Sequence, residues 1–86
     1  MPSYLVETYA PGSSDLADLA EKARNAADGQ VRYVRSVFVP EDETCFHVFE
    51  GPSARAIEVL AKAAPFAGAR IVEAIEGTDG RGRERR

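Results

Sequence analysis

The chain of 86 residues is poor in the side chains that most often reveal a function: it has one cysteine, one histidine and no tryptophan. With Cys45 alone, no disulfide can form within the chain, and this favours a reducing compartment such as the cytoplasm. With His47 as the single histidine and no serine-centred nucleophile motif, a hydrolytic triad has no support. Pro11-Gly12 and Gly51-Pro52 are turn signals and do not belong to a glycine-rich phosphate loop.

Long hydrophobic runs are also missing. No apolar stretch approaches the roughly 18 residues that a membrane-spanning helix needs. Residues 1–4 lead directly into a strand-like run, without the basic and apolar regions of a secretory signal. We therefore expect a cytoplasmic protein that has no contact with a membrane.

Basic charge is scarce as well. The net charge is −3, of which residues 77–86 contribute +2 through four arginines, one aspartate and one glutamate, so residues 1–76 carry −5. An acidic body argues against a nucleic-acid-binding face. Residues 77–86 have no apolar side chain to bury, so we expect a disordered Arg-rich tail after a single domain at 1–76.

What residues 1–76 do contain is an alternation of strand and helix signals. Runs rich in β-branched and aromatic residues predict four strands, at 4–9, 31–39, 45–50 and 70–75. Apolar residues spaced three and four apart predict two helices. Ser13 or Ser14 should cap the first, which ends at Asp28-Gly29, and Ser53 should cap the second, which ends at Pro65.

The order β-α-β-β-α-β on so short a chain predicts an α+β ferredoxin-like sandwich. Right-handed crossovers place both helices on one face of a four-stranded antiparallel sheet, with the first and third strands in the centre. A chain of this size buries only about 60% of its unfolded surface, so its core is modest and a partner often supplies further burial.

The second and third predicted strands form a hairpin whose register decides which side chains are open. A turn at Glu41 to Glu43 places Val39 opposite Cys45, Val37 opposite His47, and Arg35 opposite Phe49. Because side chains alternate between faces, the helix side then receives Val34, Ser36, Phe38, Phe46 and Val48. The open side receives Tyr33, Arg35, Val37, Val39, Cys45, His47 and Phe49. A slip of one residue would exchange these lists. So apolar an open face should not remain in water, and we predict a homodimer through it, with a pocket possible between the two sheets.

In that register His47 and Cys45 share the open face, and Glu7 on the neighbouring first strand can approach them. Histidine, cysteine and glutamate side chains together can bind a transition metal such as nickel or zinc. The plainer alternatives are a hydrogen-bonded histidine beside an apolar thiol, and a glutamate paired with Arg35.

A second hypothesis from another class is a small-molecule binding module or a cofactor-free enzyme. Its pocket on the sheet face would be lined by Tyr9, Tyr33, Phe49 and the Glu7–His47 pair. A structural or accessory protein without any site is a third possibility.

Several short strings resemble one protein family: Tyr4-Leu5-Val6-Glu7 followed by Pro11-Gly12, then 31–36, 40–46, Phe49-Glu50-Gly51-Pro52 and 70–73. The family consists of small bacterial proteins of unknown function and includes an actinobacterial nickel-binding, nickel-responsive protein with a dimeric ferredoxin-like fold. The resemblance implies this fold, a homodimer and nickel as the favoured metal. His47 and Leu60 stand where many members have a cysteine and a histidine, so no ligand set is carried over from the family.

Overall fold

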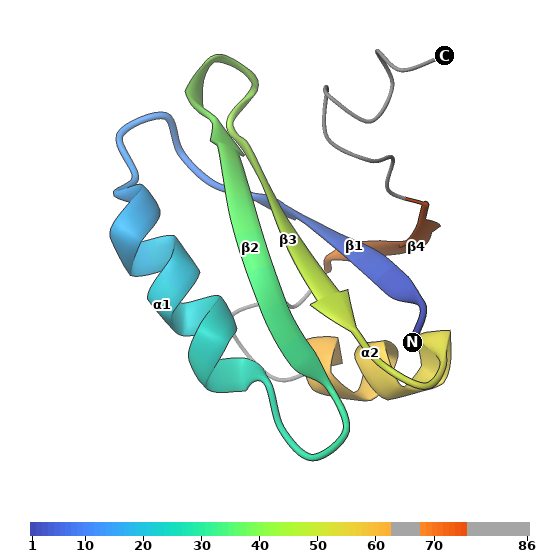
Figure 1. Cartoon of the computed structure of the whole chain (residues 1–86). Helices are drawn as coiled ribbons and strands as arrows, with labels where there is room; N and C mark the ends of the chain where they lie inside the picture. Colours follow the sequence, from blue (N-terminus) through green and yellow to red (C-terminus); the bar gives the residue numbers. More distant parts are fainter. Residues whose placement is uncertain (63–67, 76–86) are drawn as a thin grey trace, which may run out of the picture.

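The computed structural model describes residues 1–62 and 68–75. Its elements, in chain order, are β1 (Ser3–Tyr9), α1 (Leu16–Ala26), β2 (Arg32–Val39), the 3₁₀ turn η1 (Pro40–Asp42), β3 (Thr44–Glu50), α2 (Ala54–Lys62) and β4 (Arg70–Ala74) (Figure 1). The predicted strand and helix order is therefore confirmed. The predicted end of the second helix at Pro65 and the predicted tail at 77–86 lie outside the described residues.

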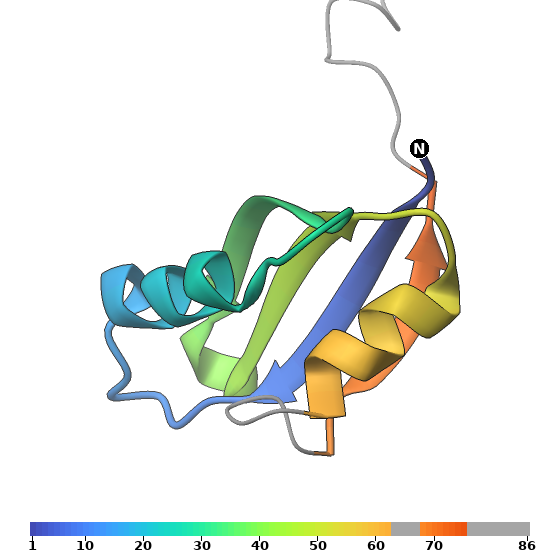
Figure 2. The same ribbon diagram turned by 90° about the horizontal axis from the view of Figure 1, so that it is seen from below.

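The four strands form one antiparallel sheet in the order β2-β3-β1-β4, with β1 and β3 in the centre. Both helices lie against the same face of this sheet, α1 along the β2 side and α2 along the β4 side (Figure 2). This is the predicted α+β arrangement of a ferredoxin-like fold. We call the face under the helices the helix face and the other one the open face.

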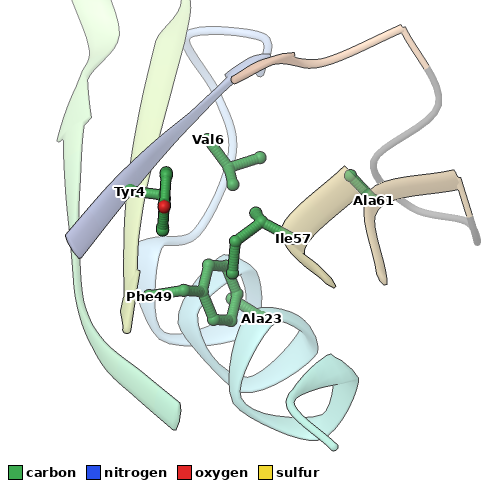
Figure 3. Close-up of a cluster of buried hydrophobic side chains, with 6 residues drawn as sticks. All are labelled: Tyr4, Val6, Ala23, Phe49, Ile57 and Ala61. Atoms are coloured by element: carbon green, nitrogen blue, oxygen red, sulfur yellow. The ribbon is translucent and has the colours of Figure 1, made fainter. Parts of the chain in front are cut away.

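One compact cluster of buried apolar side chains holds both helices against the same face of the sheet. Phe49 and Ile57 have no exposed surface, and they pack with Ala23 of α1 and with Tyr4 and Val6 of β1 (Figure 3). Burying a side chain of this size contributes about 1.5–3 kcal/mol. Because α1 and α2 both reach Phe49, this residue joins the two helices and the central strands into one core.

Both helices begin after a residue whose side chain caps the helix, but the cap of α1 is not one of the two predicted serines. Asp15, rather than Ser13 or Ser14, caps α1: its carboxylate accepts a hydrogen bond from the Ala17 backbone N–H at 3.1 Å. At α2 the predicted cap is present, since Ser53 Oγ accepts from the backbone N–H of Ala56 at 3.3 Å.

The predicted register of the β2–β3 hairpin is wrong by one residue. Val39 pairs with Thr44, Val37 with Phe46, and Ser36 with His47. The cause is the turn: η1 is followed directly by Glu43 in the left-handed region at φ 50°, so β3 begins at Thr44. In β3 every side chain therefore lies on the face opposite to the predicted one. Cys45, His47 and Phe49 are on the helix face, while Phe46 and Val48 are on the open face.

Strand β2 contains a second irregularity, a β-bulge at Val34. Tyr33 pairs with Phe49 and Arg35 pairs with Val48, so Val34 is an extra residue on β2. A bulge shifts the face alternation by one position. Tyr33, predicted on the open face, therefore lies on the helix face, whereas Arg35, Val37 and Val39 are on the open face as predicted.

Candidate functional site

His47 is the buried polar side chain of the described residues, with 2% of its surface exposed. It sits at the middle of β3, opposite Val6 of β1 and Ser36 of β2, on the helix face. Cys45, two positions earlier on the same face, is a free thiol with no exposed surface. The structure therefore brings two of the three predicted site residues together, beneath the helices and not on the open face.

A short chain of hydrogen bonds connects β2 to this histidine. Ser36 Oγ lies 2.6 Å from His47 Nδ1, and Tyr33 Oη lies 2.8 Å from Ser36 Oγ. Tyr33 and Ser36 are three residues apart, and in a regular strand they would point to opposite faces. The bulge at Val34 is what places both hydroxyl groups on the helix face.

The Tyr33 ring is held on two sides. It makes a T-shaped contact with the Phe49 ring, at a centroid distance of 5.8 Å and an interplanar angle of 70°. The guanidinium of Arg24, on α1, lies 5.4 Å from the centre of the Tyr33 ring. Such aromatic and cation–π contacts each contribute about 0.5–1.5 kcal/mol, so the phenol that reaches Ser36 is well oriented.

Burial keeps the side chains of His47 and Cys45, the two candidate metal-binding residues on the helix face, uncharged at neutral pH. Loss of hydration lowers the pKa of His47 from 6.5 to about 4, so the imidazole is neutral near pH 7. The same cause raises the pKa of the Cys45 thiol. At neutral pH this face therefore holds a neutral imidazole and a neutral thiol.

A cavity of about 270 Å³ has His47 in its wall. It lies between the end of β1, the loop that follows it and the first half of α1, and its other polar lining comes from Thr8, Ser14, Asp15, Asp18 and Lys22. Ala10, Pro11 and Leu19 supply its apolar lining. We call this cavity the α1 pocket.

Glu43, at the hairpin turn, holds the loop that forms one side of the α1 pocket. Its backbone carbonyl accepts from the N–H of Ala10 at 2.9 Å, and its carboxylate accepts from the N–H of Gly12 at 3.1 Å. A Cβ at Gly12 would meet the Pro40 carbonyl oxygen at 3.2 Å, so this close approach favours glycine. The turn that shortens the hairpin thus also positions the pocket loop.

Glu7 lies elsewhere. It pairs with Phe46 and is therefore on the open face, where Arg70 Nη1 donates to its carboxylate at 3.3 Å. Glu7 therefore forms an ion pair, as one of the sequence alternatives predicted, but its partner is Arg70 of β4 and not Arg35. Within residues 1–62 and 68–75, no group of three or more His, Cys, Asp or Glu side chains could hold a metal ion.

Of the residues expected to line a ligand pocket, Tyr9 and His47 line the α1 pocket. Tyr33 and Phe49 are not among its lining residues, and Glu7 is on the other face. The sequence interpretation missed Ser36 and the first half of α1. Ser36 carried a signal, because a serine next to the apolar residues Val37, Phe38 and Val39 is unusual on the side of a strand that faces a core.

Comparisons of the chain with protein-family models, with curated proteins and with solved structures found no match. Among the described residues, no helix has the length and apolar character needed to cross a membrane.

Mild acid should destabilise the protein through His47. Its folded pKa of about 4 lies below its ordinary 6.5, so its contribution to stability is complete above pH 6.5 and is lost as the pH falls toward 4. Between about pH 7 and about pH 5.5, wild type should lose about 1 kcal/mol more unfolding free energy than His47→Gln, which cannot be protonated. Urea unfolding at both pH values measures this. An equal loss in the two proteins would show that His47 is not buried in its neutral form.

Proposed function

We propose that this protein binds a small polar molecule in the α1 pocket and that His47 is a recognition group for it. One observation carries the proposal: the buried polar side chain of the described residues forms part of the wall of a cavity. Ligand sites combine apolar walls with a few placed polar groups, and such groups are otherwise rare in a core. A buried neutral imidazole can donate or accept a hydrogen bond without a charge to solvate.

The size of the α1 pocket restricts the ligand. Sites for drug-sized molecules occupy roughly 300–1,000 Å³. The α1 pocket, at about 270 Å³, is just below that range. A small metabolite with one or two polar groups fits this volume.

The rim of the α1 pocket carries two charged side chains whose ion pair is weak enough to be separated. Lys22 Nζ lies 3.6 Å from Asp18 Oδ2, and the two side chains are 55% and 62% exposed. An exposed pair one helical turn apart contributes only about 0.3–0.5 kcal/mol. A ligand can therefore separate the two side chains at small cost and contact either of them.

A fragment screen by two-dimensional NMR tests this proposal. Small carbonyl compounds, alcohols and amines are added to wild type, and binders should shift the backbone amides of Ala10, Leu19 and Lys22. His47→Gln should weaken such binders about tenfold, since one buried hydrogen bond contributes about 1–1.5 kcal/mol. Arg55→Ala, on the exposed side of α2, is the matched control and should change nothing. Shifts gathered elsewhere, or binding unaffected by His47→Gln, would rule the α1 pocket out.

The open face supports a second part of the proposal, a homodimer formed by two copies of this chain. The larger apolar side chains on this face are Leu5, Val37, Val39, Phe46, Val48 and Val72. Val37 is 48% exposed. Val48 is already buried within the chain, but covering the other side chains with a second copy would add burial that a chain of this size lacks.

The charges on the open face are compatible with self-association. Arg32 pairs with Glu50 at 2.8 Å, and Arg70 pairs with Glu7 at 3.3 Å. The register places these pairs in different rows, with Arg35, Val48, Leu5 and Val72 in the row between them. A two-fold related copy would thus meet two locally neutralised pairs, the exposed Arg35 side chain and the apolar side chains around them.

Two matched valine substitutions test the dimer. Val37→Glu should convert it to a monomer, because each interface would bury two unpaired carboxylates. Val59→Glu adds the same charge at a 61% exposed valine on α2 and should leave the dimer intact. Analytical ultracentrifugation of wild type and both variants gives the masses. A wild type that sediments as a single chain, or one that is dissociated equally by both substitutions, contradicts this interface.

Transition-metal binding, with nickel favoured, is a second candidate function. One observation favours it: Cys45 and His47 share the helix face two positions apart on β3. The residues fit a two-donor site and not the predicted three-donor site, because Glu7 is on the other face. The Cys45 thiol must lose its proton to bind a metal, and burial raises its pKa, so affinity would increase with pH. A reducing cytoplasm, which we propose as the compartment, would keep this thiol free.

Calorimetric titration of tag-free protein with nickel separates the two candidate functions. If Cys45 and His47 are ligands, His47→Ala should bind nickel at least tenfold more weakly than wild type, and wild-type affinity should be greater at higher pH. Arg55→Ala serves again as the control. No heat of binding by wild type, or equal binding by wild type and His47→Ala, would remove nickel from consideration.

A further inference from the structure

We infer that Glu43 is a positioning residue for the α1 pocket: its left-handed backbone directs its carboxylate to Gly12, and this contact holds residues 10–14, the pocket loop, in the conformation that binds a ligand. The hold on the loop exists without any ligand, whereas its effect on affinity rests on the proposed function of the α1 pocket. Glu43 is not among the residues that line the pocket, so it acts through the loop.

The backbone of Glu43 is unusual for a glutamate, with φ 50° and ψ 44°. Among the described residues, the others with positive φ are Gly29 and Gly68, which have no side chain. The left-handed conformation is unfavourable for a residue with a Cβ, and glycine and asparagine adopt it more readily than glutamate. A turn alone would therefore favour one of those two residue types at this position. Such backbone outliers persist where the surrounding structure holds them, and they gather at functional sites.

The side chain of Glu43 makes a contact that glycine would lack. Its carboxylate accepts from the Gly12 N–H at 3.1 Å, across 31 positions in the sequence. The backbone carbonyl of Glu43 accepts from the Ala10 N–H at 2.9 Å, and any residue at position 43 could provide that second bond. The backbone of Glu43 thus holds the start of the pocket loop, and its carboxylate holds the middle.

Gly12 lies in a tight turn whose neighbouring residues form part of the pocket wall. The Ser14 N–H donates to the Pro11 carbonyl at 2.9 Å, which closes the turn around Gly12. Both Pro11 and Ser14 line the α1 pocket. Pro11, Gly12 and Ser13 are exposed, so little packing holds the turn in place. Loss of the bond from Gly12 to the Glu43 carboxylate should therefore let this part of the wall move.

A wall that moves lowers affinity, because only a fraction of the molecules then has the conformation that binds. The apparent dissociation constant equals the intrinsic constant divided by that fraction. One hydrogen bond to a charged group is strong enough to change the fraction several-fold. We therefore expect the α1 pocket to bind its ligand about fivefold more weakly when the Glu43 carboxylate is absent.

Substitutions at position 43 separate the carboxylate from the backbone conformation. Glu43→Gly accepts the left-handed conformation and keeps the turn, but has no side chain. Glu43→Asn also tolerates this conformation, and its side chain is one methylene shorter. Glu43→Gln keeps the length of the side chain and an acceptor oxygen. Glu41→Gln, at an exposed position of the adjoining η1, removes the same charge and is the matched control.

Nitrogen-15 relaxation measures the order of the pocket loop without any ligand. The order parameter of the Gly12 amide should be about 0.85 in wild type and should fall below about 0.6 in Glu43→Gly and Glu43→Asn. The Ala10 amide, which bonds to the backbone at position 43, should stay rigid in every variant. Glu43→Gln and Glu41→Gln should resemble wild type. A Gly12 amide that is as ordered in Glu43→Gly as in wild type overturns the inference, and Glu43→Asn provides the same comparison if Glu43→Gly fails to fold.

Cyclopentanone, cyclopentanol and cyclopentylamine, one from each class of the fragment screen, test the effect on affinity. A probe that shifts the wild-type amides of Ala10, Leu19 and Lys22 should bind Glu43→Gly and Glu43→Asn about fivefold more weakly. Glu43→Gln and Glu41→Gln should bind it within about twofold of wild type. Equal binding by wild type and Glu43→Gly, or an equal loss in Glu43→Gln and Glu43→Gly, contradicts the positioning role. If Gly12 is ordered by Glu43 but none of these probes shifts the wild-type amides, the ligand site fails, and the effect on affinity fails with it.

Discussion

The β-bulge at Val34 is the constraint on which the polar part of this core depends. Because one extra residue interrupts the alternation of β2, Tyr33 and Ser36 point to the same face although they are three positions apart. Both hydroxyl groups then reach beneath α1, where Ser36 meets His47. With a regular β2, the phenol would be on the open face and the histidine would lose the second half of its hydrogen-bond chain.

His47 is a polar side chain on a face of the sheet that otherwise packs apolar side chains against the helices. Its neighbours across the sheet are Val6 on one side and Ser36 on the other. Burying an imidazole without a partner costs about 1–3 kcal/mol, so Ser36 is needed for stability as well as for any recognition role. Function and stability are therefore coupled at this position, and a smaller apolar residue in place of Ser36 would disturb both.

The predicted site residues lie on two different faces of the sheet, for which we propose different roles. Cys45 and His47 lie on the helix face with the core, whereas Glu7 forms an ion pair with Arg70 on the open face. The helix face provides the α1 pocket, because the loop held by Glu43 and the first half of α1 leave a cavity over the end of β1. The open face provides apolar side chains together with two ion pairs, Arg32–Glu50 and Arg70–Glu7. We propose ligand binding for the first and self-association for the second.

The order of strands and helices could be predicted from the sequence, because periodicity, turn residues and capping residues are local signals. Strands, helices and the two-layer arrangement follow from them. His47 could also be identified as the residue of interest, since the chain has no other histidine. Which face it occupies was decided by the tertiary structure. The hairpin turn is one residue shorter than predicted, because Glu43 adopts a left-handed conformation directly after η1. With a side-chain period of two, that single residue moves the whole of β3 to the other face, and no local pattern distinguishes the two registers because both faces of β3 are apolar.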